Sequence, residues 1–483
     1  MELKENYTWM MVPLQINPTE WHLQETSLWQ PAEMKLETQV FYNYIEQWLL
    51  AKANSTNRET LPQDEQSYSI YTIKPSRKAT PGDTAEEQAL QLRLSAWARF
   101  NTTIWRQQRT GLPFRLLNDE QELASVKLLV NSHSATGLLL IPISLQKQQA
   151  TTDDLITLNY YQDKIDRQAP LCVSDADITA MDPRRVESIR RMADGMALTW
   201  DEATGPQWTM NTIIDFLLSD FCGAYTLFNT TRIHLFTYLR VPQSQWQQEK
   251  GLTDLMRIVR CQNTTYNPVL TQPDGSDPFL RTFNNIFVGA SVEGGAMLTL
   301  SAPEDDVKGA STFISNFAKA SLLKRYLWVY LMVVLQRHAL LNLIGELSNI
   351  NRQHTEERSL DALGQLLERL ATIKTCTYYT HISDYTQHNE FYDYCTHRMH
   401  IDEQYAEISE KMHLLETVAE SRKNDREEVK SRRIELILMV LTIASGTCDA
   451  LTVLTLDRYS PYSGIITALC LILLIAYVWN RKK

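Results

Sequence analysis

The chain has 483 residues, of which 44% are hydrophobic and 22% are charged, and this composition is typical of a folded protein. Its formal net charge of -10 argues against direct nucleic-acid binding, because such binding needs clustered Lys and Arg that release counterions. The seven cysteines have no Cys-x-x-Cys pair and no zinc-ligand spacing, so we expect reduced thiols and no metal site.

Up to about residue 305 the chain alternates between strand-like and helix-like patterns. Helical patterns lie at 84–105 and 209–222, and polar stretches at 52–66 and 271–278 are expected to be surface loops. This mixture predicts an α+β cytoplasmic domain over residues 1–310, whose last two strands form a hairpin around Glu293. Runs rich in β-branched and aromatic residues predict strands at 8–16, 67–74, 137–145, 232–241, 285–292 and 296–302.

Beyond residue 310 the chain is expected to be helical only. Helical patterns cover 311–349, 355–373 and 384–456, and the last of these has no proline and no interior turn signal except Gly446. The apolar run at 326–335 is too short to span a membrane, so it predicts a buried helix of the soluble part. Residues 311–433 are therefore predicted to form long stalk helices, with heptad-like apolar positions at Ile401, Tyr405, Ile408, Met412 and Leu415.

Two apolar runs predict a two-helix transmembrane hairpin over residues 434–483. The first run, 434–456, has 23 residues and would measure about 34 Å as a helix, against a hydrocarbon core of about 30 Å. The second run, 462–479, ends in Tyr477 and Trp479, an aromatic pair expected at a membrane interface. Basic residues precede the first run and follow the second. Both termini are therefore expected on the cytoplasmic side of the inner (cell) membrane.

One face of the first membrane helix is polar. At about 100° per residue, Thr442, Ser445, Asp449 and Thr452 lie within roughly 80° of one another, and the same face reaches Glu435. A polar face that carries carboxylates suits the wall of a cation path, so we predict that these five residues line a pore. Close packing of small residues is the alternative for the serine and threonines. The basic residues that precede the helix lie off this face, at Arg422, Lys423, Arg426, Lys430, Arg432 and Arg433.

The C-terminal part of the chain resembles the CorA family. The resemblance covers about 310–483 and is carried by the long stalk helix, the segment MVLTIASGTCDALTVL, the very short turn and the basic end NRKK. It implies a CorA-like funnel architecture. Because one hairpin cannot enclose a water path, we expect a homo-oligomer, and the resemblance points to a homopentamer in the lipid bilayer.

Two departures from the CorA pattern refine the resemblance. The family's Gly-Met-Asn tripeptide is missing, because its place reads TLDRYSP, and the N-terminal domain is enlarged. In this the chain is similar to the divergent CorA-like membrane effectors of type III CRISPR systems, which serve antiviral defence. That likeness implies that residues 1–310 sense a nucleotide second messenger, an S-adenosylmethionine–AMP conjugate, and that the stalk opens the pore.

Residues for such a ligand can be sought in the sequence. An anionic, adenine-bearing ligand needs Arg or Lys for its phosphate and aromatic faces for its base. Two basic stretches, 105–115 and 184–191, offer these side chains, although a solvated helix face or a core edge is the alternative for each. The candidates are Arg106, Arg109, Arg115, Arg184, Arg185, Arg190 and Arg191.

Motifs for catalysis are missing. The sequence has no GxxxxGKS/T, GxGxxG, HExxH or GxSxG, so we do not expect an enzyme. The stretch 380–403 gathers four histidines, yet only His381 with His388 and His397 with His400 have turn spacing, which favours a helix face over a metal site. The sequence thus predicts a ligand-gated cation channel or transporter. A CorA-type magnesium or other divalent cation transporter, and a membrane-anchored sensor without a pore, stay open as alternatives.

Overall fold

A computed structural model describes most of the chain as far as Leu454. The described residues are 1–17, 20–21, 23, 26–32, 41–42, 69–78, 80, 82–118, 123–131, 134–164, 172–174, 181–221, 223–229, 231–271, 277–307, 309–350 and 356–454. They divide into two units, Met1–Ile408 and Ser409–Lys483, and each unit is described by itself. In the second unit, side chains are described as far as Leu415 and then at 417, 428–439 and 442.

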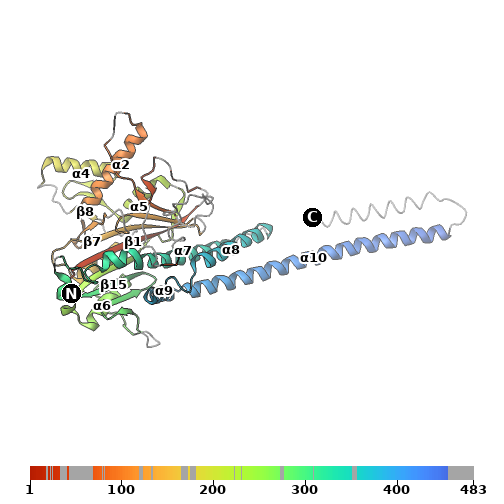
Figure 1. The fold of residues 1–483 in the computed structure, drawn as a ribbon. Helices are drawn as coiled ribbons and strands as arrows, with labels where there is room; N and C mark the ends of the chain where they lie inside the picture. The colour runs from red at the N-terminus through yellow and green to blue at the C-terminus, as the bar shows by residue number, and fades with distance from the viewer. Residues whose placement is uncertain are drawn as a thin grey trace. The chain divides into compact units, whose positions relative to one another are not determined.

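The first unit is built on a large mixed sheet whose long central strand is β1 (Figure 1). Strand β1 pairs antiparallel with β7 on one side and with β12 on the other, and β12 pairs parallel with β15. The main path through the sheet runs β13-β14-β15-β12-β1-β7-β5-β4-β8-β10-β9. The described strands are β1 (Glu5–Ile16), β2 (Trp29–Pro31), β3 (Ser69–Ile73), β4 (Trp105–Gln107), β5 (Pro113–Leu116), β6 (Lys127–Asn131), β7 (Thr136–Leu145), β8 (Cys172–Ser174), β9 (Thr199–Asp201), β10 (Gly205–Trp208), β11 (Tyr225–Leu227), β12 (His234–Pro242), β13 (Leu280–Phe283), β14 (Ile286–Ala290) and β15 (Gly294–Ser301).

All six strands expected from β-branched and aromatic runs are present. The expected hairpin is confirmed too, since β14 and β15 pair antiparallel across a turn that Ser291 closes by donating its N–H to the Gly294 carbonyl. Nine other strands were not predicted: β2, β4, β5, β6, β8 to β11 and β13. All of them except β6 have only three or four residues, which do not establish a period of two. The mixed α/β fold of this part is therefore confirmed.

Helices follow or flank the strands. Helices α2 and α3 begin at capping boxes, in which Thr84 pairs with Glu87 and Thr151 pairs with Asp154. The described helices are α2 (Ala85–Thr102), α3 (Thr152–Gln162), α4 (Pro183–Gly195), α5 (Met210–Leu218), α6 (Gln248–Val259), the π-helix η6 (Ala318–Tyr326), α7 (Leu327–Ile350), α8 (Glu356–Thr377), α9 (Thr386–Arg398) and α10 (Ile401–Leu454), with short 3-10 turns η3 (Ser219–Phe221), η4 (Gln243–Gln245) and η5 (Pro303–Asp306).

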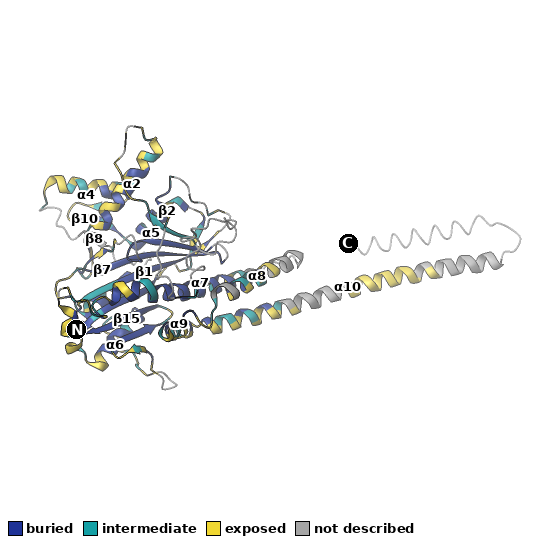
Figure 2. Ribbon diagram, in the orientation of Figure 1, coloured by how far each residue is buried: buried dark blue, intermediate teal, exposed yellow. Residues whose placement is uncertain are grey.

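The two faces of the sheet carry different helices. Successive side chains of β1 alternate between faces. Thr8 donates to Asn159 of α3 at 3.2 Å, so α3 lies on one face, and α6 packs beside it. On the other face Phe236 of β12 packs against Tyr330 of α7, with ring centroids 4.4 Å apart. Figure 2 shows that α7 and the central strands are buried almost throughout.

Helix α7 confirms the expectation of a buried helix at 326–335. Within the described part of the chain, the continuous helix Ala318–Ser348 is the one that is long and apolar enough to cross a membrane. Inside the protein, 83% of its most apolar 18-residue stretch is buried. It packs against β1, β7, α8 and α9, so the protein itself supplies its apolar surroundings. Of the predicted membrane hairpin, the first helix falls on α10 as far as Leu454, while 462–479 lies outside the described residues.

The helical region differs from expectation at two points. Residues 311–316 are turns rather than helix, and helix begins at Phe317 with a π segment. The single helix expected from 384 is broken at Met399 and His400, where His400 has a left-handed φ of 58°. This break was missed because neither residue is a glycine or proline. Helix α10 then runs 54 residues from the first unit into the second, with Ile401, Ile408 and Met412 buried. The predicted domain boundaries at 310 and 433, and the funnel, stay predictions.

Candidate functional site

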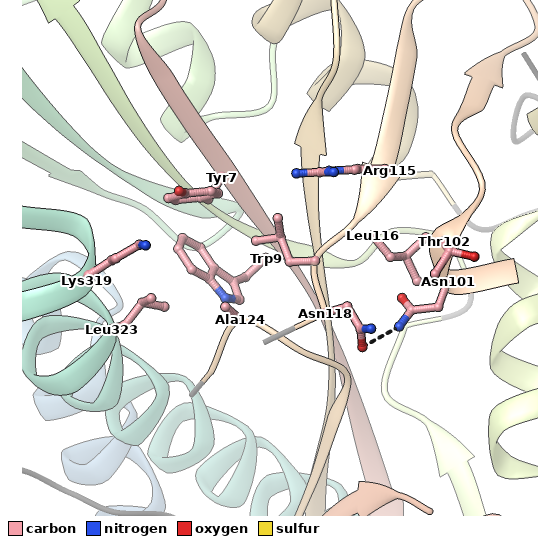
Figure 3. A pocket seen from close by; sticks show the side chains of 11 residues that line it. Tyr7, Trp9, Asn101, Thr102, Arg115, Leu116, Asn118, Ala124, Lys319 and Leu323 are labelled. Atoms are coloured by element: carbon pink, nitrogen blue, oxygen red, sulfur yellow. Dashed lines mark hydrogen bonds between the residues drawn. The ribbon is translucent and has the colours of Figure 1, made fainter. Parts of the chain in front are cut away.

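A cavity of about 390 Å³ lies in the first unit, between the sheet and the π-helix (Figure 3). We call it the Tyr7 cavity. Four separate segments build it: strand β1, the C-terminal end of α2, strand β5 with the loops beside it, and the π-helix. Its lining is Tyr7, Trp9, Asn101, Thr102, Arg115, Leu116, Leu117, Asn118, Ala124, Lys319 and Leu323.

The aromatic wall of the Tyr7 cavity comes from β1. Tyr7 and Trp9 are two positions apart on the strand, so both project toward the same face of the sheet. The Trp9 indole N–H donates to the Leu123 carbonyl at 2.7 Å, which fixes the ring, and Tyr7 lies edge-on to it with centroids 6.0 Å apart. Tyr7 also stacks on Tyr238 of β12 at 6.0 Å. The cavity therefore has a held aromatic surface.

Two cationic side chains come from opposite sides of the cavity. Arg115 extends from β5 and Lys319 from the π-helix, and Figure 3 shows both beside Tyr7. Burial raises the pKa of Tyr7 well above its usual range, and the charge of Glu5 and the 2.7 Å hydrogen bond from the Tyr7 hydroxyl to Glu5 raise it further. The charges of Arg240 and Arg115 oppose this shift in pKa. Tyr7 is thus a neutral phenol next to a positive side chain.

A buried amide forms the inner wall. Asn101 is only 8% exposed, and its Nδ2 donates to Asn118 Oδ1 at 2.7 Å. Its Oδ1 is buried and finds no hydrogen-bond partner among the described residues. Leaving such an acceptor unpaired costs about 1–3 kcal/mol, so the group is suited to accept an N–H from a ligand.

A second cavity of about 240 Å³ shares this wall. Asn101, Thr102 and Asn118 line both cavities, while the second one is also bordered by Trp97 of α2 and by Lys74 after β3. A ligand that contacts the Asn101 amide therefore has space on two sides of it.

The predicted ligand residues are divided by the fold. Arg115 lines the Tyr7 cavity, whereas Arg106 donates to the Gly111 carbonyl at 3.1 Å and Arg109 lies over the Tyr161 ring at 6.0 Å. Arg184, Arg185, Arg190 and Arg191 are exposed on α4 and line neither cavity. Arg190 pairs with Glu202 at 3.1 Å, and Arg191 pairs with Glu187 at 3.0 Å.

The predicted pore residues lie on α10. Glu435 and Thr442 are exposed, and Thr442 donates its hydroxyl to the Leu438 carbonyl at 2.8 Å. The backbone at Ser445, Asp449 and Thr452 is helical, but their side chains lie outside the described residues. The polar face of α10 stays a prediction beyond Thr442.

The four histidines of the stretch 380–403 differ in burial. His388 is buried beside Ser383, with 3.2 Å between the His388 Nδ1 and the Ser383 hydroxyl, while His381, His397 and His400 are exposed. Among the residues whose positions are described, no group of three or more His, Cys, Asp or Glu side chains is placed to hold a metal ion.

Sequence reasoning missed Tyr7, Trp9, Asn101 and Lys319. Trp9 was assigned to the predicted strand 8–16, whereas Tyr7 lies just before it and belongs to β1 only in the structure. The amide and the lysine belong to predicted helical patterns with no sign that they meet. The spacing of Tyr7 and Trp9 on one strand face was a usable signal, but Asn101 and Arg115 lie about 100 positions away in the sequence, and Lys319 about 310. No family model, curated protein or solved structure matches the chain, so the likeness to the CorA family remains an expectation based on residues 310–483.

Proposed function

We propose that this chain is a homo-oligomeric, ligand-gated cation channel or transporter of the cell membrane, with its ligand site in the Tyr7 cavity. The observation that carries the proposal is the cavity itself, which is lined together by two cations, two aromatic residues and Asn101, whose buried amide oxygen has no hydrogen-bond partner among the described residues. By its resemblance to CorA-like effectors, the protein would serve antiviral defence and open when a nucleotide second messenger binds.

The cavity suits an anionic, adenine-bearing ligand of the S-adenosylmethionine–AMP type. Arg115 and Lys319 supply charge-assisted hydrogen bonds for a phosphate. Tyr7 and Trp9 offer apolar ring surface for a base, and Asn101 Oδ1 offers an acceptor for an exocyclic amino group. The second cavity beyond Asn101 leaves space for the remainder of a two-part ligand.

The cation path would follow the polar face of α10. Glu435 and Thr442 belong to that face and are exposed, and Asp449 is its innermost carboxylate within the predicted 434–456 span. Rings of carboxylates select cations when several copies surround an axis. Two membrane helices in each copy, with both termini in the cytoplasm, complete this arrangement.

A membrane-anchored sensor without a pore is the second candidate function. The observation that favours it is that the Tyr7 cavity lies wholly in the first unit, so ligand binding there does not itself require conduction. A housekeeping magnesium transporter is less well supported, because the Gly-Met-Asn tripeptide of CorA is absent.

Ion flux separates the two candidates. The purified full-length chain is reconstituted in liposomes, and cation efflux is measured with and without the S-adenosylmethionine–AMP conjugate. The channel proposal expects ligand-dependent efflux that falls at least tenfold in Asp449→Asn and is unchanged in Glu410→Gln, an exposed carboxylate of α10 outside the predicted span. Ligand binding with no efflux would support the anchored sensor instead.

A further inference from the structure

A chain of aromatic rings leads from the Tyr7 cavity to α9. Tyr7 stacks on Tyr238 at 6.0 Å, and Tyr238 stacks on Phe317 at 6.2 Å. Phe317 stacks on Tyr326 at 5.9 Å, and Tyr326 meets Phe391 of α9 edge-on at 5.2 Å. All but Tyr7 are buried, so a displacement at one ring is transmitted to its neighbour rather than to solvent.

The contact between Phe317 and Tyr326 depends on the π-helix. The two residues are nine positions apart, and in an α-helix, at about 100° and 1.5 Å per residue, they would lie on opposite faces and about 13 Å apart along the axis. Bonds from each N–H to the carbonyl five residues earlier, such as Leu327 N–H to Leu322, give more than four residues per turn. Nine residues then make close to two turns, and both rings reach the same side.

The π segment also forms part of the cavity wall. Lys319 and Leu323 both line the Tyr7 cavity, and both lie between Phe317 and Tyr326. A ligand that contacts Lys319 therefore binds to the π-helix Ala318–Tyr326. The backbone hydrogen bonds of this segment decide whether Phe317 and Tyr326 are in contact. π-Helices are rare, because each turn must accommodate one residue more than an α-helical turn, at some cost in free energy. Those that occur are frequently found at functional sites.

We propose that the segment Ala318–Tyr326 is a two-register coupling element, whose π form connects the Tyr7 cavity to α9 and whose α form disconnects it. This inference rests on the proposed function for the identity of the ligand. In the π form, ligand contacts at Tyr7 and Lys319 stabilise the stack of Phe317 on Tyr326, which presses on α9 just before the break at His400 and the start of α10. The coupling has a defined two-state basis, the register of one helix.

Removal of one residue from the π segment tests the proposal. Ala320 is an exposed position in the π segment. Its deletion removes one residue, which is the difference between a π-helical and an α-helical hydrogen-bonded turn. Deletion of Ser311, exposed in the preceding turn, shortens the same connection without touching the π segment and is the matched control. Both full-length variants are compared with the wild-type chain by hydrogen exchange of the α9 amides, with and without the S-adenosylmethionine–AMP conjugate, and by ligand binding.

The expected results separate coupling from binding. Without ligand, the α9 amides of the Ala320 deletion exchange at least tenfold faster than those of the Ser311 deletion. Phe317 and Tyr326 would then lie about 12 Å apart along an α-helix and about 80° apart around it, so Phe317 no longer supports the ring that packs on Phe391. With ligand, the wild-type chain and the Ser311 deletion gain protection in α9, while the Ala320 deletion binds within about threefold of wild type and gains none. Unchanged α9 exchange in a folded Ala320 deletion would overturn the proposal, whether or not the ligand binds.

A second pair of variants covers the case in which the Ala320 deletion does not fold. Phe317→Leu removes the central ring without changing the register, and Phe313→Leu changes a neighbouring ring that is 55% exposed and outside the chain of contacts from Tyr7 to Phe391. The proposal expects loss of the ligand response in α9 for Phe317→Leu only. Equal responses in the two variants would refute it. If the wild-type chain binds no conjugate, the proposed ligand is wrong, and the unliganded α9 exchange still decides the coupling.

Discussion

The side-chain amide of Asn101 donates to Asn118 Oδ1 at 2.7 Å, and this hydrogen bond forms the wall between two cavities of the sheet domain. The bond holds Asn101 in one orientation and leaves its own Oδ1 without a partner among the described residues. An acceptor fixed in this way contributes to binding only if the ligand brings a donor. The first prediction follows from this geometry.

Asn101→Ala should weaken binding of the S-adenosylmethionine–AMP conjugate about tenfold, because a hydrogen bond to a buried acceptor contributes about 1–1.5 kcal/mol. Titration calorimetry on the full-length chain measures the change in Kd. Thr102→Val is the matched control, since the Thr102 hydroxyl already donates to backbone carbonyls of α2 at 3.0 and 3.2 Å. A Kd of Asn101→Ala within twofold of wild type would rule out the assigned role of this amide.

The two cations of the Tyr7 cavity should contribute to affinity through charge. Arg115→Gln and Lys319→Gln are each expected to raise the Kd for the same conjugate by about five- to thirtyfold, the effect of losing about 1–2 kcal/mol of charge-assisted hydrogen bonding. Because both side chains are exposed, raising the salt concentration should weaken binding to the wild-type chain more than to either variant. Arg184→Gln, on α4 and away from the cavity, should bind as wild type. Equal effects of all three substitutions would point to a general charge effect rather than a site.

The stability of the first unit should fall in mildly acidic solution. Burial is the main cause that lowers the pKa of His234 to about 3 and of His338 to about 4; the charge of Arg337 contributes to both shifts, and that of His338 contributes to the shift of His234. Below about pH 6.5 the unfolded chain binds protons that these two buried rings do not, so the free energy of unfolding decreases by up to about 1.4 kcal/mol per pH unit for each histidine. Asp163 acts in the opposite sense, because burial raises its pKa to about 6 and its contribution to stability is lost as the pH rises through that value.

Denaturant unfolding of the full-length chain in detergent between pH 7.5 and 5 measures this loss. We expect His338→Gln, in which no group titrates, to reduce the slope of stability against pH by close to one proton relative to wild type. Asp163→Asn should make the acid loss steeper, since it removes the opposing group. A slope in His338→Gln identical to that of the wild-type chain would contradict the assignment of a neutral buried imidazole at this position.

Two glycines provide a test of the contact between α7 and the sheet. A methyl group added at Gly295 of β15 would lie 2.5 Å from the Tyr330 hydroxyl, and this ring is fully buried and fixed by a 2.5 Å hydrogen bond between its hydroxyl and His234 Nε2. Gly295→Ala should therefore lower the free energy of unfolding by about 1–3 kcal/mol through overpacking.

Gly345 of α7 is the matched control. It is exposed and an added methyl group would meet no atom within 4 Å, so Gly345→Ala should stabilise the helix by about 0.5–1 kcal/mol. Thermal unfolding of the two variants under one condition compares the signs. A neutral Gly295→Ala would show that Tyr330 of α7 does not pack on β15 as described, and a destabilising Gly345→Ala would show that Gly345 does not lie on an open face of α7.

Local patterns in the sequence were sufficient for six of the strands and for the buried helix. The alternating and near-continuous apolar runs of β1, β7 and β12 predicted strands because a strand repeats every two residues. Burial of 326–335 was expected because that apolar run is too short to span a membrane, although the whole helix Ala318–Ser348 is long enough to do so. The candidate Arg115 was proposed from the sequence as a basic residue near aromatic ones, and it lines the cavity. These properties depend on residues within a few positions of one another.

The tertiary structure decided which of these residues meet. Four segments that are far apart in the sequence supply Tyr7, Asn101, Arg115 and Lys319. The order of these segments along the chain does not predict the order of strands in the sheet that brings them together. The π register of Ala318–Tyr326 was likewise unpredictable, because its cost is offset by packing of Phe317 and Tyr326 against distant rings rather than by local propensity. The sequence by itself determined six of the strands and the buried helix, because each depends on a local pattern, whereas the cavity and its aromatic link to α9 exist only through long-range packing.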